Sequence, residues 1–308
     1  MKRSLPVQIL LSTHNGARFL THQLETLRSQ DYPQISILIR DDGSNDDTLQ
    51  ILEEYCRKHQ RFAFYSGHRM GAGASFFDLL EHADPDAAYY HFCDQDDHWL
   101  KDKLTRAVNK LENAPSDLPL LYCSRVVIGN AELKPLRLSD LPMRGLSFAN
   151  AMVECPVWGS TVSINPKARE LALKQLPTFF SMHDSWLYLI ISAFGLVLYD
   201  GSPTMVHRRH DQNFSQIPAT SRDRLHTVWS RYRKRGRERP MARQAAEFQR
   251  LFGEQLAPDK RAVLDRFLDA RKHWWTRIRY ACRREVYHQS RAGNLLLTLL
   301  LMLDRVYD

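Results

Sequence analysis

Three carboxylates stand within four positions at the end of one apolar run. The run Tyr89–Cys93 predicts a buried strand, and Asp94, Asp96 and Asp97 come after it. Crowded carboxylates repel one another, so such a cluster normally needs a cation, and hard oxygen ligands favour Mg²⁺ or Mn²⁺ over zinc. The alternative is a solvated acidic turn in which Asp96 or Asp97 caps a helix that begins near Trp99. Neighbouring strand ends bear on this choice, because open α/β sheets bind ligands at the carboxyl ends of their strands.

A second acidic pair follows another apolar run. The run Ile35–Arg40 predicts a strand, and Asp41 and Asp42 stand at its end. Two adjacent carboxylates could accept hydrogen bonds from the ring N–H of a pyrimidine and from a ribose hydroxyl. The alternative is a helix-capping turn, although Ser44–Thr48 offers capping side chains without either aspartate. Two acidic strand ends on one sheet edge favour a nucleotide site that holds a cation.

Small polar residues follow the first predicted strand, Val7–Ser12. Thr13 and Asn15 could contact the base and the phosphates of a nucleotide, since a strand end facing a helix start offers hydroxyls and backbone groups. The dipeptide of Asn15 and Gly16 could equally form a simple turn. This strand end therefore agrees with a nucleotide site without requiring one.

A group transfer also needs a base that activates the incoming nucleophile. Asp184, which precedes an apolar segment with helical periodicity, is the candidate base; its alternative role is a helix N-cap. The polar cluster His207–Asn213 follows a predicted strand over Gly195–Tyr199. It could supply a metal ligand and cations for a diphosphate, or it could be a solvated basic loop.

The elements that would position these residues alternate along the chain. Short apolar runs recur about every 27 residues in the first hundred positions, with helical segments between them, which predicts an α/β fold with a mostly parallel sheet. The later elements are predicted as helices over Leu100–Glu112 and Ser185–Ala193, strands over Leu120–Val127, Val157–Ile164 and Gly195–Tyr199, and a loop excursion over Asn130–Asn150.

Several classes of protein are excluded by missing motifs. No Gly-x-Gly-x-x-Gly follows the first strand and no Gly-Lys-Ser/Thr occurs, which argues against dinucleotide-dependent redox chemistry and P-loop hydrolysis. The 5 cysteines include no Cys-x-x-Cys pair, so neither a disulfide framework nor a zinc site is indicated, and we expect a reducing cytoplasm. The apolar run Val7–Leu11 is too short for a signal peptide. Acids, a nucleotide and a divalent ion together indicate transfer of a group from a nucleoside diphosphate.

Charge divides the chain into two predicted domains, residues 1–220 and residues 221–308. The second holds 21 Lys and Arg against 10 Asp and Glu, a net charge of +11; the first holds the remaining 22 and 25, a net charge of −3. The basic region carries no strand signal and is predicted to be mainly helical. Its charge should seek phosphates on anionic lipid, on a lipid-linked diphosphate or on nucleic acid.

The apolar run Leu295–Leu303 lies near the end of this basic region. It is too short to cross a bilayer, which needs about 20 apolar residues. It could lie in a membrane interface, or pack on the body of the protein or on a second copy of the chain. A nucleic-acid-binding protein is the rival of another class, although no recognised nucleic-acid motif is present.

Five motifs in order resemble those of the family 2 glycosyltransferases of GT-A fold, in the bacterial rhamnosyltransferase-like branch. The resemblance runs from about Val7 to Ser215. The motifs are Leu-Ser-Thr-His-Asn-Gly-Ala-Arg-Phe-Leu, Arg-Asp-Asp-Gly-Ser-Asn-Asp-Asp-Thr, Cys-Asp-Gln-Asp-Asp-His-Trp, His-Asp-Ser-Trp-Leu and His-Arg-Arg-His-Asp-Gln-Asn. It implies a GT-A nucleotide-sugar-binding domain followed by a C-terminal helical region.

The resemblance also implies roles for single residues. Asp94 and Asp96 would be the Asp-x-Asp pair that holds Mg²⁺ or Mn²⁺, with Asp96 the direct ligand and His210 at the metal or the diphosphate. Asp184 would be the catalytic base for transfer with inversion. The donor nucleotide would be bound by Thr13, Asn15, Asp41, Asp42 and Asp94. Two positions depart from the family pattern: His14 and His207 stand where aromatic residues are common.

The implied reaction moves a sugar to a hydroxyl of a cell-surface polysaccharide, an O-antigen or a lipid-linked glycan. The branch favours L-rhamnose from dTDP-L-rhamnose; a UDP-sugar donor and a nucleotidyltransferase reaction are the alternatives. No nucleic-acid partner is expected. The implied location is the cytoplasm, with peripheral attachment to the inner face of the cytoplasmic membrane through the basic region, and a homo-oligomer is compatible with the same features.

Overall fold

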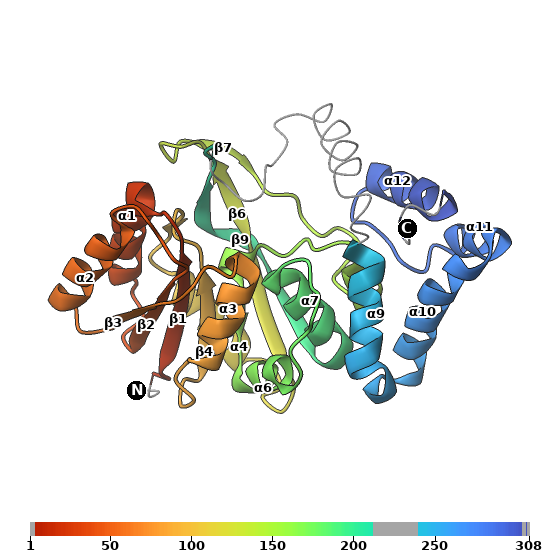
Figure 1. Cartoon of the computed structure of the whole chain (residues 1–308), viewed down its shortest axis with the longest axis horizontal. Coiled ribbons are helices and arrows are strands. Elements are labelled where there is room, and N and C mark those ends of the chain that lie inside the picture. Colours follow the sequence, from red (N-terminus) through yellow and green to blue (C-terminus); the bar gives the residue numbers. More distant parts are fainter. Residues whose placement is uncertain (1–3, 212–239, 304–305, 307–308) are drawn as a thin grey trace. The chain divides into compact units, whose positions relative to one another are not determined.

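The computed structural model describes residues 4–211, 240–303 and 306, and the chain forms two compact units (Figure 1). The first unit contains Met1–Leu141, Val157–Leu176 and Met182–Arg209. The second contains Pro142–Pro156, Pro177–Ser181 and His210–Asp308. The domain boundary predicted at residue 220 lies outside the described residues.

A mixed sheet forms the core of the first unit, in the order β3-β2-β1-β4-β8-β6-β9-β5, with β7 paired to β6. Its first four strands are parallel, as the alternating apolar runs predicted. Register places Thr13 beside Asp41 and Leu11 beside Cys93, so three of the polar strand ends share one edge. These strands are β1 (Val7–Thr13), β2 (Ile35–Asp41), β3 (Phe62–Ser66) and β4 (Tyr89–Cys93).

Amphipathic helices connect and cover the strands. In α1, Leu20, Leu24 and Leu27 repeat at helical spacing and are all buried, which gives that helix its core-facing stripe. Asn165 caps α6 by accepting a hydrogen bond from the Ala168 amide. The helices of this unit are α1 (Ala17–Arg28), α2 (Thr48–Lys58), α3 (Ala72–Glu81), α4 (Lys103–Glu112), α6 (Pro166–Lys174) and α7 (His183–Phe194).

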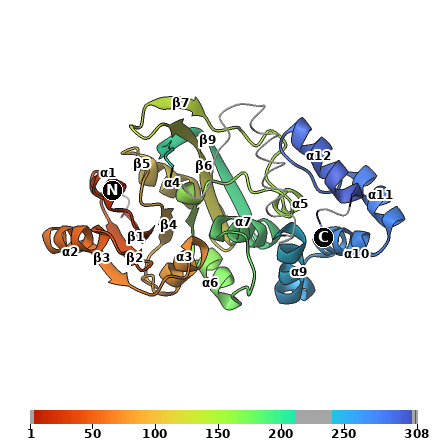
Figure 2. The ribbon, with the colours of Figure 1, turned by 45° about the horizontal axis from the view of Figure 1, so that its top comes forward.

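Strand β9 (Leu196–Arg208) is longer than predicted and pairs in parallel with β6 (Leu120–Gly129), as Figure 2 shows. The predicted end of this strand at Tyr199 was wrong, because its second half pairs with both β6 and a further strand. This further strand is β5 (His98–Trp99), which runs antiparallel to β9. A helix beginning near Trp99 was therefore also wrong, and α4 begins at Lys103.

Two other predicted segments differ from the structure. Of the predicted strand Val157–Ile164, only its end forms a strand, β8 (Ser163–Ile164). It is preceded by a 3₁₀ turn, η1 (Gly159–Thr161), which the Thr161 hydroxyl tightens by donating to the Trp158 carbonyl. The predicted excursion 130–150 contains β7 (Pro135–Leu138), an exposed strand without alternating burial, and the first residues of α5 (Phe148–Ala151).

All regular elements in the described residues of the second unit are helices, as predicted for the basic region. Phe148, Phe248 and Phe252 are buried, and their rings pack in tilted pairs within its core. No helix in the described part of the chain is long and apolar enough to cross a membrane. Its elements are α5, α9 (Pro240–Phe252), η2 (Gly253–Gln255), α10 (Pro258–Asp269), η3 (Ala270–Lys272), α11 (Trp274–Arg283) and α12 (Arg291–Met302).

Candidate active site

The end of β9 contacts the acidic cluster that follows β4. Asp97 is fully buried, and its Oδ1 lies 2.9 Å from His207 Nδ1 and accepts a hydrogen bond from the Arg208 amide. Arg208 Nε also donates to the Asp96 carbonyl at 2.7 Å. His207 and Arg208 therefore belong to a buried strand end, and the alternative of a solvated basic loop was wrong for these two residues.

Burial and crowding make the cluster electrostatically strained. Burial raises the pKa of Asp94 well above its ordinary value, and the charges of Asp97, Asp96 and Asp184 raise that pKa further. Burial alone would lower the pKa of His207, but the neighbouring carboxylates, Asp97 first, raise it to about 9. One positive imidazole thus partly compensates several buried carboxylates, and a further cation would be stabilised here.

Gln95, which the sequence analysis passed over, ties this loop to the end of β1. Thr13 Oγ1 and the His14 amide donate to Gln95 Oε1 at 2.6 and 2.9 Å, and Gln95 Nε2 donates to the His14 carbonyl at 3.1 Å. A Cβ at Gly16 would collide with the same Oε1 atom, so glycine permits this close approach. The sequence signal for Gln95 is its position between Asp94 and Asp96.

Asn15 joins the ends of β1 and β2. Its φ of 46° is left-handed, a conformation that asparagine adopts more readily than most residues. Its amide donates to Ser44 Oγ at 2.8 Å, and its Oδ1 accepts from the Asn45 amide at 2.9 Å. The structure therefore gives Asn15 a turn-forming role, and its contact with a nucleotide stays a prediction.

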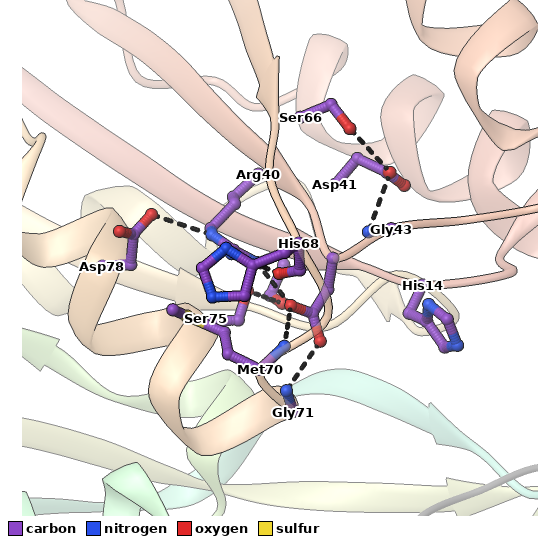
Figure 3. Close-up of polar contacts among 12 residues, drawn as sticks. His14, Arg40, Asp41, Gly43, Ser66, His68, Met70, Gly71, Ser75 and Asp78 are labelled. Atoms are coloured by element: carbon purple, nitrogen blue, oxygen red, sulfur yellow. Dashed lines mark hydrogen bonds and ion pairs between the residues drawn. The ribbon is translucent and has the colours of Figure 1, made fainter.

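Asp41 organises the turn after β2. It accepts hydrogen bonds from the Gly43 amide at 3.1 Å and from the Ser66 hydroxyl at 3.2 Å (Figure 3). It also accepts from the amide and the hydroxyl of Ser44, at 3.0 and 2.5 Å. A carboxylate offers about four acceptor positions, so these bonds use the acceptor capacity of Asp41. A direct contact of Asp41 with donor nucleotide, which stays a prediction, would replace one of these bonds.

Asp42 connects β2 to the loop that precedes α3. Its oxygens accept from Arg40 Nη1 at 2.6 Å and from the amides of Met70 and Gly71 at 2.9 and 2.8 Å (Figure 3). Burial alone would raise the pKa of Asp42, but these bonds lower it below its ordinary value. The group is therefore ionised at neutral pH and keeps about one acceptor position for a ligand.

Arg40 is the buried centre of this connection, and no role was predicted for it from the sequence. Besides Asp42, its guanidinium donates to Asp78 Oδ2 at 2.8 Å and to the His68 carbonyl at 3.0 Å (Figure 3). Its side chain is 2% exposed. A single buried cation thus joins β2, the loop before α3 and α3 itself, which makes the shape of this part of the site depend on Arg40.

Asp184 stands in the first turn of α7. Its Oδ1 accepts from the Ser185 amide at 2.7 Å, and burial raises its pKa to about 6, against the opposing effect of backbone hydrogen bonds from Ser185, Asp184 and Gly159. The charge of Asp184 raises the pKa of Asp94, so Asp184 lies near the acidic cluster. A carboxylate with this pKa is ionised at neutral pH and can accept a proton there.

The backbone of η1 is pressed against Asp184 and its neighbour. A Cβ at Gly159 would lie 3.1 Å from His183 Nε2 and 3.3 Å from Asp184 Oδ2. His183 stacks on Phe92 and packs at a tilt against Phe76, and burial lowers its pKa to about 3, so the imidazole is neutral. Asp184 is therefore the titratable group of this pair that can act as a base near neutral pH.

A divalent ion is compatible with Asp94 and Asp96. In the described residues, no group of three or more His, Cys, Asp or Glu side chains is arranged to hold a metal ion. Mg²⁺ is commonly bound through one or two carboxylates, with substrate phosphates and water completing its shell, so two aspartates at one strand end fit that mode. The buried Asp97 Oδ2 makes no hydrogen bond within the described residues, which marks unused acceptor capacity beside them.

His210 follows β9 by two residues and belongs to the second compact unit. Asp94, Asp96 and Asp184 all belong to the first. The role of His210 at the metal or the diphosphate therefore stays a prediction, whereas the three aspartates form one group.

The model of the family described as Glycosyl transferase family 2 matches residues 8–189, which is more than half of the chain and includes Asp94, Asp96 and Asp184. The chain belongs to glycosyl transferase family 2. It is therefore a nucleotide-sugar-dependent glycosyltransferase, which favours sugar transfer over the nucleotidyltransferase alternative.

Curated relatives of this family 2 glycosyltransferase include a rhamnosyl transferase and a putative glycosyltransferase of teichuronic acid biosynthesis. The chain is 30% identical over 213 residues to the dTDP-rhamnosyl transferase RfbG of Shigella flexneri, covering 66% of this chain and 72% of that protein. It is also 30% identical over 101 residues to a putative teichuronic acid biosynthesis glycosyltransferase, TuaG, of Bacillus subtilis, covering 32% of this chain and 39% of that one. The family 2 glycosyltransferase thus resembles rhamnosyltransferases, as its motifs predicted.

Solved glycosyltransferases share the fold. The mannosyltransferase PcManGT of Pyrobaculum calidifontis, solved with GDP-Man and Mn²⁺, matches at a TM-score of 0.58 and 16% identity, over 99% of this chain and 86% of that one. TarS of S. aureus, solved with UDP-GlcNAc, matches at 0.56 and 14%, over 98% and 89%. The fold of the family 2 glycosyltransferase is therefore GT-A, as predicted.

Proposed function

We propose that this glycosyltransferase moves L-rhamnose from dTDP-L-rhamnose to a hydroxyl of a cell-surface polysaccharide, O-antigen or lipid-linked glycan, with inversion. The observation that carries this proposal concerns Asp184, whose pKa is about 6. Its charge, like those of Asp97 and Asp96, raises the pKa of Asp94 in the acidic cluster after β4. A base beside a cation site is the arrangement that an inverting transfer from a nucleoside diphosphate needs. The likeness to the dTDP-rhamnosyl transferase supports the choice of donor.

In the proposed reaction, Asp184 accepts the proton of the acceptor hydroxyl. The hydroxyl oxygen forms its bond to the anomeric carbon as the bond from that carbon to the diphosphate breaks, and the electron pair leaves with the nucleoside diphosphate. Asp94 and Asp96 would hold Mg²⁺ or Mn²⁺, which supplies positive charge to the leaving diphosphate. His207, positively charged beside Asp97, adds to the positive potential at this edge of the sheet.

The donor pocket of the proposed enzyme is built on the ends of β1 and β2. Asp42 keeps an acceptor position for the ring N–H of a pyrimidine, and Arg40 holds it in place. Thymine and uracil both present that N–H, so Asp42 fits dTDP and UDP donors alike. A UDP-sugar donor in the same kind of pathway is therefore the second candidate.

A donor screen tests this proposal. Thermal unfolding would be followed with dTDP-L-rhamnose, UDP-glucose, UDP-galactose and UDP-N-acetylglucosamine, each with Mg²⁺, with Mn²⁺ and with EDTA. We expect dTDP-L-rhamnose with metal to raise the melting temperature most, because a ligand that binds the folded state stabilises it by mass action. A larger shift with one UDP-sugar would replace rhamnose by that sugar.

Transfer itself would be measured with radiolabelled donor and a membrane extract as the source of acceptor. We expect label in the glycan or lipid-linked fraction only when a divalent ion is present. Label retained in EDTA would contradict the metal proposal. Hydrolysis of every donor without transfer would contradict the proposed class of acceptor.

A further inference from the structure

Helix α11 in the second unit exposes aromatic and aliphatic side chains. Trp275, Ile278, Arg279 and Cys282 repeat at positions i, i+3, i+4 and i+7, which places them on one face, and all four are exposed. Trp275 is 48% and Ile278 is 41% exposed, whereas Tyr280, outside that spacing, is 4% exposed. One face of α11 therefore carries apolar side chains beside an arginine and is uncovered by the described residues.

The aromatic end of α11 is ordered by contacts among its own residues. The Trp275 ring stacks on His273 at 4.5 Å between centroids, with an angle of 4° between the planes. Trp274, which is 63% exposed, meets Trp275 edge-on at 5.9 Å. Exposed tryptophans with a polar N–H and an apolar ring favour the boundary between water and a membrane.

Helix α12 packs against α11, and the two lie side by side in Figures 1 and 2. Leu295, Leu299 and Leu303 recur every four residues and are 65%, 48% and 66% exposed, whereas Leu297 and Leu301 are buried. Arg291 begins the same stripe one turn earlier and is exposed. This neighbouring helix therefore repeats the arrangement of α11, an exposed apolar stripe with a cation beside it.

The charge around α11 is of one sign. The segment 270–284 contains Arg271, Lys272, Arg277, Arg279, Arg283 and Arg284 and no Asp or Glu. Lys272 pairs with Asp269, and Arg283 lies 3.6 Å from Glu285. Arg271, Arg279 and Arg284 are exposed and form no ion pair within the described residues. These cations complement an anionic surface.

We propose that α11 and α12 form a binding surface for a bilayer that contains anionic phospholipid. The apolar side chains enter the boundary between headgroups and acyl chains, and the arginines contact the phosphates. A bilayer is favoured over a protein or nucleic-acid partner because the surface combines exposed apolar side chains with cations that form no ion pair within the described residues. A second copy of the chain would bring the same positive charges together, and nucleic acid offers no apolar layer for the leucine stripe. The surface deepens the proposed function by bringing the enzyme to a lipid-linked acceptor.

Co-sedimentation of the full chain with vesicles tests this surface without any transfer reaction. We expect binding to vesicles of phosphatidylglycerol mixed with phosphatidylcholine, and much weaker binding to phosphatidylcholine alone. Added salt should weaken the binding, because screening removes the electrostatic part. Equal binding to both vesicles, or none to either, would overturn the proposal. Because no donor or acceptor is present, failure here leaves the proposed sugar transfer unaffected.

Two sets of substitutions locate the surface. Arg279→Gln with Arg284→Gln should weaken vesicle binding roughly fivefold for each cation removed, and Trp275→Ser with Ile278→Ser should remove most of the binding left at high salt. The matched control is Arg57→Gln with Lys58→Gln, two adjacent exposed cations at the end of α2 in the first unit, which should bind as the parent chain does.

Folding of each variant would be checked by its melting temperature, and its assembly state by analytical ultracentrifugation. Vesicle binding that survives both sets of substitutions would overturn the assignment to α11. So would a parent chain that ignores vesicles but forms a dimer that Trp275→Ser with Ile278→Ser dissociates. Salt-sensitive binding to RNA in place of vesicles would overturn it in favour of a nucleic-acid partner.

Discussion

His207 Nδ1 lies 2.9 Å from Asp97 Oδ1, and both side chains are buried. The contact joins the end of β9 to the loop after β4, residues that stand 110 positions apart in the chain. It places a positive imidazole behind the carboxylates that are proposed to hold a metal ion. The stability of this loop and its charge are therefore linked through one ion pair.

Asp97→Asn should destabilise the protein by about 1–3 kcal/mol at pH 6, since a buried partner loses its counter-charge. Because the pKa of His207 is raised to about 9, the pair contributes fully below the pKa of an unfolded histidine, about 6.5. That contribution is lost as pH rises through about 9, so the difference between variant and parent should shrink there. Urea unfolding in EDTA at several pH values measures this difference in the free energy of unfolding.

The control for this measurement is Asp86→Asn, which changes an exposed aspartate in the turn before β4. It should alter stability little at any pH. A destabilisation by Asp97→Asn that is the same at pH 6 and above pH 9 would contradict the ion pair.

Asp184→Asn should lower turnover by roughly 10²–10⁴-fold, because an amide cannot accept the proton of the acceptor hydroxyl. Donor binding should be retained, which a thermal shift with nucleotide-sugar would measure. In the parent enzyme, the rate should fall as pH drops below about 6, where Asp184 becomes protonated. Equal losses of donor binding and turnover in the variant would show that Asp184 acts in binding.

Asp96→Ala should abolish metal-dependent transfer, because it removes the proposed direct ligand of the cation. Removing the metal from the parent enzyme with EDTA should have the same effect, and added Mn²⁺ should restore the parent only. A rate titration with Mn²⁺ measures this, with Asp86→Asn again as the control aspartate. Undiminished transfer by the Asp96 variant would exclude a metal role for that residue.

Gly16→Ala should destabilise the protein by about 1–3 kcal/mol, since the new Cβ collides with the Gln95 amide. Combining it with Gln95→Ala should cost less than the sum of the two single changes, because the collision with Gln95 disappears and only the contact with Thr13 Oγ1 at 2.8 Å is left. Gly201→Ala is the matched control: the nearest atom to its Cβ would be Leu141 Cδ2 at 3.9 Å. Strict additivity in a double-mutant cycle of urea unfolding would contradict the contact.

Much of the site was predicted from local patterns. Apolar runs that alternate with helical segments predict parallel strands, and the carboxyl ends of such strands share one edge. Thr13, Asp41 and the cluster after Cys93 therefore come together for a reason that needs no coordinates, and the register of β1 with β2 and β4 agrees. The N-terminal turn of α7 likewise followed from the apolar segment after Asp184.

The second half of β9 could not be predicted in this way. Its residues are mixed in polarity, and they form a strand because Met205 and Val206 pair with β5 and His207 pairs with β6. The contacts of Gln95 with Thr13 and His14, about 80 positions away, are of the same kind. Such contacts depend on which distant segments meet, which local periodicity does not encode.

The chain's own sequence thus determined the acidic groups, the strand ends that carry them and the family pattern. Tertiary structure decided how those groups are charged and held. Burial raises the pKa of Asp184 to about 6, Arg40 positions Asp42, and Asp97 holds His207 positive. The reason is physical: desolvation and charge pairing act through space, so they arise only once distant segments have packed together.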